Sequence, residues 1–141
     1  MTAILPMSVE SNLAVVRRAY AAFGRGDVAG VLDCFAPDAC FDCMGAPHLP
    51  CAGLWRGHEG LGRFLAAIGA MAEVRAFEPG PLLPLSGGRV MVEGTETLHF
   101  RGSGREATGR WLHVFVLGGG LIQSGTEWNE SAVLAAAFRG G

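Results

Sequence analysis

In the first part of the chain, hydrophobic residues recur at steps of three and four, the spacing of a helix that packs on one side. Leu13, Val16, Tyr20 and Phe23 follow this spacing and predict a helix over about 9–24. The arginines of this segment fall outside the apolar stripe. The chain therefore opens with an amphipathic helix.

Two further helices are expected. Asp27 caps a short one whose apolar face extends to Phe35, and Pro37 ends it because the residue before proline avoids the helical conformation. Another is predicted over about 57–69 from the same spacing of apolar residues. Helices thus dominate the first half of the chain.

After these helices the hydrophobic pattern changes to alternate residues, which is typical of strands. Strands are predicted near 72–84, 89–101, 106–118 and 120–129, and a short helix over about 131–138 follows. An earlier strand is predicted near 38–44, between the second and third helices. Three prolines place the strand at 72–84 at a sheet edge or at a bulge, since proline donates no ladder hydrogen bond. We expect an α+β fold in one domain, 1–141 with an ordered core of about 9–138, in which a curved, mainly antiparallel sheet wraps over the helices and leaves a cone.

The strand near 106–118 is apolar on both faces. One face carries Trp111, His113, Phe115 and Leu117. The other carries Leu112, Val114 and Val116. Because a half-solvated strand alternates apolar with polar residues, we expect helices on the first face and a partner subunit on the second, which gives a homodimer.

Composition excludes several functions. The net charge of −2 does not supply the positive field that nucleic-acid binding requires. All 11 basic residues are arginine, so a Schiff-base lysine and the lysine of a P-loop are excluded. Met1–Val9 lack the features of a secretion signal and no long apolar run is present, so we expect a cytoplasmic protein without membrane contact.

A group of cysteines suggests zinc, because Cys34, Cys40, Cys43, His48 and Cys51 are metal-ligand types within a short span. Cys40 and Cys43 are three residues apart, so in a strand they point to opposite faces and cannot chelate together. We expect free thiols, no metal and no cofactor.

Three segments, 16–27, 55–57 and 113–129, resemble the SnoaL-like polyketide cyclase and ketosteroid isomerase group of the NTF2-like superfamily. The resemblance spans about 12–138. It implies an NTF2-like cone of three N-terminal helices on a strongly curved sheet, a dimer through the convex sheet face, and small, apolar, oxygenated substrates.

The residues depart from the ketosteroid isomerase pattern at three positions. Cys43 matches the catalytic aspartate, Ala19 matches the oxyanion-hole tyrosine, with Tyr20 one residue away, and His113 matches the protonated aspartate. The proton-shuttling carboxylate is therefore missing from its family position, and the chain resembles the SnoaL-like members more closely.

His113 is the candidate proton carrier, because a histidine among aromatic residues is neutral near pH 7 and accepts a proton or donates a hydrogen bond. The alternative is a core histidine satisfied by a neighbouring side chain. Tyr20 is either a hydrogen-bond donor to a developing oxyanion or a core residue. Asp42, Glu127 and Asn129 are expected on the outer face.

The residues expected to line the pocket beside His113 and Tyr20 are Val16, Phe23, Phe41, Cys43, Trp55, Trp111, Phe115, Ser124, Thr126 and Trp128. One hypothesis is a cofactor-independent isomerase, cyclase or dehydratase that uses His113 for general acid-base chemistry. A second is a non-catalytic dimeric protein that binds an apolar or aromatic ligand, which the absence of paired inward carboxylates favours. A third is an interaction domain with a collapsed pocket.

Overall fold

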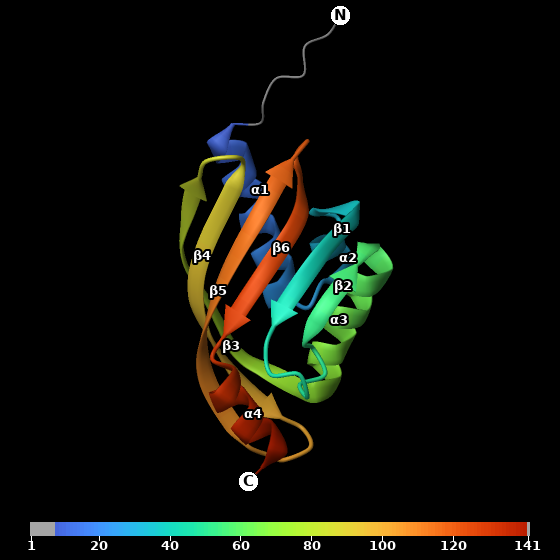
Figure 1. Ribbon diagram of the computed structural model, residues 1–141, viewed down its shortest axis with the longest axis vertical. Coiled ribbons are helices and arrows are strands. Elements are labelled where there is room, and N and C mark those ends of the chain that lie inside the picture. The colour runs from blue at the N-terminus through green and yellow to red at the C-terminus, as the bar shows by residue number, and fades with distance from the viewer. Residues whose placement is uncertain (1–7, 141) are drawn as a thin grey trace, which may run out of the picture.

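The structure, a computed structural model, describes residues 8–140, which form four helices and one six-stranded sheet (Figure 1). The expectation about a secretion signal concerns Met1–Val9, and residues 1–7 of this segment lie outside the described part. The elements are α1 (Val9–Gly24), α2 (Val28–Leu32), β1 (Phe35–Met44), β2 (Gly53–Arg56), α3 (Gly57–Met71), β3 (Ala72–Leu85), β4 (Arg89–Phe100), β5 (Glu106–Gly118), β6 (Leu121–Asn129) and α4 (Ser131–Arg139).

The helix starts follow local capping. The Ser8 side chain accepts a hydrogen bond from the backbone N–H of Ser11 at the start of α1. Asp27 caps α2, as predicted, by accepting from Gly30 N–H at 2.9 Å. The predicted extent of α2 is wrong, because the helix ends at Leu32 and Phe35 begins β1, where it pairs with Ile122 of β6.

The strand order is β2-β1-β6-β5-β4-β3. The prediction for the proline-rich strand is confirmed, since β3 lies at an edge and its pairing with β4 is irregular between Pro79 and Leu82. The short strand β2 was not predicted. β1 runs parallel to β6, while every other neighbouring pair is antiparallel, so the sheet is mixed and brings an early strand against the last one.

A bulge in β6 decides which of its side chains face the helices. Leu117 pairs with Ile122, but Val116 pairs with Ser124, so Gln123 is an extra residue in the strand. Without it, the register of the turn would place Thr126 opposite His113. With it, Glu127 lies opposite His113 and shares its face.

The helices α1 and α2 cover one face of the sheet, and α3 lies beside β1 and β2 (Figure 1). Between helices and sheet lies a core that includes Val16, Phe100 and Ile122, all fully buried. The opposite, outer face of the sheet keeps apolar side chains exposed, among them Met44, Leu54, Leu83, Val116 and Trp128. No helix within residues 8–140 is long and apolar enough to cross a bilayer.

Candidate functional site

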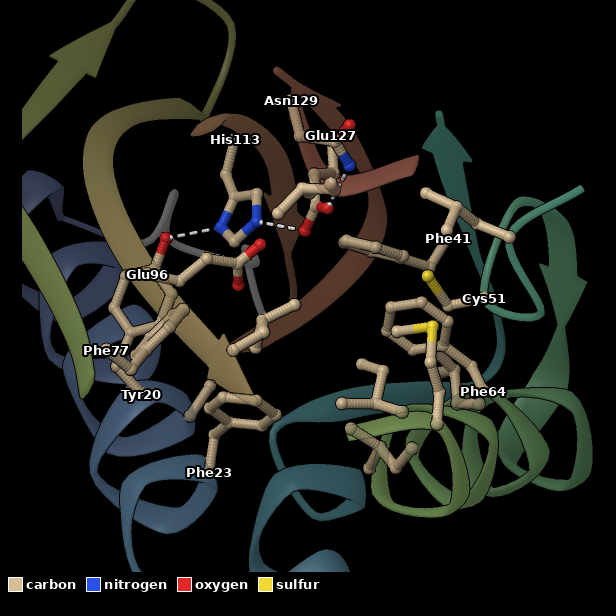
Figure 2. Close-up of a pocket in the computed structure, with 18 of the residues that line it drawn as sticks. Tyr20, Phe23, Phe41, Cys51, Phe64, Phe77, Glu96, His113, Glu127 and Asn129 are labelled. Atoms are coloured by element: carbon tan, nitrogen blue, oxygen red, sulfur yellow. Dashed lines mark hydrogen bonds and ion pairs between the residues drawn. The ribbon is translucent and has the colours of Figure 1, made fainter. Parts of the chain in front are cut away.

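A cavity of about 100 Å³ opens between the helices and the inner face of the sheet (Figure 2). Its wall is largely aromatic and aliphatic, and it carries a few polar side chains. An apolar cavity of about 150 Å³ is large enough to admit benzene, so this volume fits a small molecule and not a polycyclic one. The aromatic wall is formed by Tyr20, Phe23, Phe35, Phe41, Phe64, Phe77, Phe100 and Phe115, and the polar groups are those of Tyr20, Cys51, Glu96, His113, Glu127 and Asn129.

His113 lies on the inner face of β5 and is only 5% exposed. Its ring stacks on Trp111 with centroids 4.1 Å apart, and the edges of Phe115 and Phe41 complete its surroundings. The alternating pattern of β5 therefore turns this histidine toward the cavity, as the sequence predicted. The aromatic neighbours fix the ring plane and exclude water from it.

Both ring nitrogens of His113 have a partner (Figure 2). The hydroxyl of Tyr20 lies 2.8 Å from Nδ1, and Oε1 of Glu127 lies 2.7 Å from Nε2. Tyr20 comes from α1 and Glu127 from β6, and both line the same cavity. The helix, the central strand and the last strand thus form one continuous hydrogen-bonded chain, Tyr20–His113–Glu127.

The ionisation of Glu127 sets the direction of these hydrogen bonds. Burial raises the pKa of Glu127, but the hydrogen bond and charge of His113, with donors from Asn129 and Cys43, outweigh it and hold the pKa below its usual range. An ionised carboxylate only accepts, so Nε2 carries a proton and donates it to Glu127. In the neutral ring, Nδ1 then accepts from the Tyr20 hydroxyl.

A second set of donors holds Glu127 in place. Asn129 Nδ2 donates to Oε2 at 2.9 Å, and the thiol of Cys43 donates to the same oxygen at 3.5 Å. The first residue of α4, Ser131, donates to Oδ1 of Asn129 at 2.8 Å and so fixes the orientation of its amide. The carboxylate therefore keeps a defined position although it lies in an apolar cavity.

Tyr20 stays protonated. Burial, and secondly the charge of Glu127, raise the pKa of Tyr20 above its ordinary value. The hydroxyl is therefore a hydrogen-bonding group and not a standing tyrosinate at neutral pH.

Glu96 is a second carboxyl group in the cavity, on the inner face of β4. Burial raises the pKa of Glu96 from its usual 4.5 to about 8, and the charges of Glu127 and Cys51 act in the same direction. At neutral pH Glu96 is therefore a carboxylic acid, while Glu127 is a carboxylate. Two carboxyl groups whose pKa values differ in this way can divide the roles of acid and base.

The cysteines form no metal centre. All four are free thiols, and within residues 8–140 no group of three His, Cys, Asp or Glu side chains is arranged to hold a metal ion. Cys51 lines the cavity, and its interaction with the neighbouring Cys43 side chain lowers the pKa of the Cys51 thiol. The polar side chains that face the cavity carry exchangeable protons or hydrogen-bond acceptors, which suits them to proton exchange and hydrogen bonding.

The structure divides the residues expected at the pocket into three groups, of which two lie at or near the cavity and the third, described below, lies on the outer face of the sheet. Tyr20, Phe23, Phe41, His113 and Phe115 line the cavity. Val16, Cys43, Trp55 and Trp111 lie behind its wall or beside it and support it: Trp111 stacks on His113, and Trp55 donates to the carbonyl of Cys51 at 3.0 Å.

The expected faces of β6 must be corrected. Ser124, Thr126 and Trp128 share the outer face, and Trp128 is 41% exposed. Glu127 and Asn129, expected outside, line the cavity. The bulge at Gln123 reverses the faces of all later residues of the strand, and it also overturns the expectation that no paired carboxyl groups face inward.

Glu96 is the functional residue for which the sequence held an unused signal. Val90, Val92, Leu98 and Phe100 occupy alternate positions of β4 and are all buried, which places Glu96 on their face. A carboxyl on an otherwise apolar strand face is a sign of function. For Glu127 no such signal exists, because nothing in the residues around Gln123 predicts the bulge.

Known proteins share this architecture. The sequence profile of the SnoaL-like domain matches residues 16–124. The uncharacterized protein Rv0034 of Mycobacterium tuberculosis is 39% identical over 67 residues, which are 48% of this chain and 50% of that protein, so the match spans about half of the relative's length.

Two solved structures extend the similarity to nearly the whole chain. An NTF2-like protein from Burkholderia xenovorans LB400 superimposes with a TM-score of 0.80 at 30% identity, covering 94% of this chain and 98% of the other. TerC, co-crystallized with polyporic acid, gives a TM-score of 0.82 at 22% identity and covers 92% and 98%. The curved mixed sheet, its covering helices and the matched profile lead to one conclusion: the chain belongs to the SnoaL-like domain family and has the NTF2-like, ketosteroid isomerase-like fold.

Proposed function

We propose that this protein binds a small, largely apolar, oxygenated molecule in the cavity and moves a proton on it without a cofactor. The reaction class is isomerisation, cyclisation or dehydration by general acid-base chemistry, with His113 as the proton carrier. The observation that carries the proposal is the Tyr20–His113–Glu127 chain, both ends of which face one largely apolar cavity.

The chain of hydrogen bonds defines a route for the proton. When the Tyr20 oxygen accepts a proton from the substrate, its own proton passes to Nδ1 of His113, and the proton on Nε2 passes to Glu127. The carboxyl of Glu127 then returns a proton to a second atom of the substrate. This leaves the imidazole proton on Nδ1, so it must return to Nε2 before the next turnover. Proton uptake and proton return take place at different points of the cavity, which is what an isomerisation requires.

The surroundings support this role. Ionised Glu127 stabilises the imidazolium that forms on His113 during the transfer, because the two groups are 2.7 Å apart and shielded from water. Tyr20 starts from its protonated state, since the pKa of its hydroxyl is raised. The aromatic wall supplies contact area for an apolar substrate.

A small unsaturated ketone tests the proposal. We expect the protein to accelerate the conversion of 3-cyclohexen-1-one to the conjugated ketone, followed by its ultraviolet absorption. His113→Ala should lower the rate by about 10²- to 10⁴-fold, the usual contribution of general acid-base catalysis, and Tyr20→Phe should also lower it. His99→Ala is the matched control, because this histidine lies outside the cavity.

The mechanism is wrong if His113→Ala works as fast as the parent protein while circular dichroism shows an intact fold. The second candidate, a non-catalytic binding protein, rests on the predominantly apolar wall of the cavity. It predicts that the ketone binds in a calorimeter while its rate of conversion equals that in buffer. TerC, co-crystallized with polyporic acid, supports binding of a small molecule by this fold.

A further inference from the structure

The two carboxyl groups of the cavity differ in how they are satisfied. Glu127 accepts hydrogen bonds from His113, Asn129 and Cys43. Glu96 has no hydrogen-bond or ion-pair partner among the described residues, although it lines the cavity. A polar group that faces an apolar cavity without a partner costs stability, so a ligand that satisfies it binds with a corresponding advantage.

The Glu96 carboxyl faces the cavity itself. Glu96 pairs with Gly109 on β5 and with Phe77 on β3, and the Leu134 side chain of α4 fills the space above Gly109. Figure 2 shows the carboxyl directed into the cavity near the His113–Glu127 pair. The carboxyl is thus accessible to a molecule in the cavity.

The cavity wall carries two acidic side chains and no arginine. The chain contains no lysine, so the only side chain there that can become a cation is His113, which is engaged at both nitrogens. A carboxylate ligand would meet two acidic side chains without a compensating charge. An anionic ligand is therefore disfavoured.

Aromatic rings surround the same space. Phe23 and Phe77 have centroids 4.8 Å apart, Tyr20 and Phe77 are 5.6 Å apart, and Phe41 lies at the opposite wall. Aromatic faces attract cations, and the attraction is strongest where water is excluded. An acidic group among aromatic rings is the chemistry that recognises an alkylated ammonium ion.

We infer that the cavity takes a small molecule that carries an ammonium group, anchored by the Glu96 carboxylate among these aromatic rings. The inference rests on the proposed role of the cavity as a ligand site, and it narrows the ligand to molecules that carry an ammonium group. The Tyr20–His113–Glu127 chain keeps its own hydrogen bonds when Glu96 is engaged.

Binding of such a cation is linked to the proton on Glu96, because only the ionised carboxyl attracts it. The pKa of Glu96 is about 8, so affinity for a permanent cation should fall by about tenfold for each pH unit below that value. The other titratable groups that face the cavity are Tyr20, Cys51, His113 and Glu127. Tyr20 and Glu127 keep one charge state through this range, because the pKa of Tyr20 is raised and that of Glu127 is lowered.

Two molecules of the same shape test the inference: choline, and 3,3-dimethylbutan-1-ol, in which carbon replaces the charged nitrogen. Their binding is measured by isothermal titration calorimetry from pH 6 to pH 9. At pH 9 we expect choline to bind at least tenfold more tightly than the alcohol. Its affinity should fall about tenfold from pH 7 to pH 6, while that of the alcohol stays constant.

Glu96→Gln should remove both the preference for choline and its pH dependence. Glu93→Gln is the matched control, because it removes the same charge from an exposed position on the same strand and should leave both unchanged. Cys51→Ser tests whether the Cys51 thiol causes the pH dependence of choline binding. Because we assign this dependence to the Glu96 carboxyl, it should persist in the variant.

Any of the following results overturns the inference: equal affinities for choline and the alcohol, a choline preference that survives Glu96→Gln, or a pH dependence lost in Cys51→Ser. Binding of neither molecule overturns it as well. The ketone assay decides the proposed function separately, so binding of the alcohol without a preference for choline refutes the ammonium ligand alone. A choline preference in a protein that does not convert the ketone refutes proton transfer alone.

Discussion

A buried carboxyl group without a partner weakens a fold whenever it has to carry its charge. Glu96 is such a group, whereas Glu127 is stabilised as an anion by its donors. The same two side chains that set the chemistry of the cavity therefore act in opposite directions on stability. The effects of Glu96 and Glu127 on the free energy of unfolding can be separated, because the two carboxyl groups ionise in different pH ranges.

The stability of the protein should fall as the pH rises from about 4.5 to about 8, as far as Glu96 determines it. In this range the folded protein keeps the proton of Glu96, because its pKa is about 8, while the unfolded chain has lost it, because the usual value is 4.5. Fewer protons are bound in the unfolded state, so the free energy of unfolding decreases with pH.

Glu96→Gln tests this linkage in urea unfolding at pH 5 and pH 9. Relative to the parent, the variant should gain about 2–4 kcal/mol between the two pH values, since each pKa unit corresponds to about 1.4 kcal/mol. Glu93→Gln should show no such gain. If the free energy of unfolding of Glu96→Gln changes with pH in the same way as that of the parent, the raised pKa of Glu96 is contradicted.

Among single residues, the sequence predicted two of the three members of the hydrogen-bonded chain and missed Glu127. His113 and Tyr20 were both candidates, because parity on a strand and spacing on a helix depend only on neighbouring residues. Their direct contact was not predicted, since it joins positions 93 residues apart. Glu96 was visible in the alternation of β4 and was not used.

At the level of strands, one glycine makes space for the aromatic rings around His113. Gly125 pairs with Phe41 on one side and Phe115 on the other. A Cβ atom there would lie 2.8 Å from Cδ1 of Phe41 and 3.0 Å from Cδ1 of Phe115, closer than real contacts allow. The glycine therefore sets the distance between two walls of the cavity.

Gly125→Ala should destabilise the protein by about 1–3 kcal/mol, the usual cost of overpacking a core, and displace the rings beside His113. Urea unfolding measures the first effect, and the chemical shifts of the His113 ring measure the second. Gly62→Ala is the control, because a Cβ at this helical glycine meets nothing within 4 Å. That variant should be neutral or gain up to about 1 kcal/mol from helix propensity. A stable Gly125→Ala protein with unchanged His113 signals would refute this account of packing.

Most of the helices and strands followed from periodicity, within a few residues at their ends. The exceptions have long-range causes. β1 begins at Phe35 because β6 offers it a partner, and this pairing cannot be read from the local pattern, which suggested that the helix continues. The faces of Glu127 and Asn129 depended on one extra residue in β6, and a single error of parity hid two of the six polar residues of the cavity.

For the whole molecule, we propose a homodimer through the outer face of the sheet. In the single chain, Leu112 and Val114 are half-buried there, and Trp128, Met44 and Leu54 are exposed. An apolar surface that extends over several strands is typical of an interface. In a two-fold dimer the same face of each copy would cover the other.

Val114→Arg should convert such a dimer into a monomer, because it places a charge in the middle of the apolar face. Analytical ultracentrifugation measures the mass of the particle in solution. Val28→Arg is the control, since Val28 is also exposed but lies on α2, away from this face. A parent protein that sediments as a monomer, or a Val114→Arg protein that remains dimeric, would disprove the interface.

The pairing of β1 with β6 has a consequence for biosynthesis. β6 occupies the interior of the sheet, between β1 and β5, yet the ribosome makes it last of the six strands. While the chain emerges, β1 and β2 have no neighbour that joins them to the remaining strands, so the sheet is completed only when translation is almost finished. A ribosome that stalls before Leu121 would leave two unjoined groups of strands with exposed edges, which is a substrate for chaperones and not a smaller working protein.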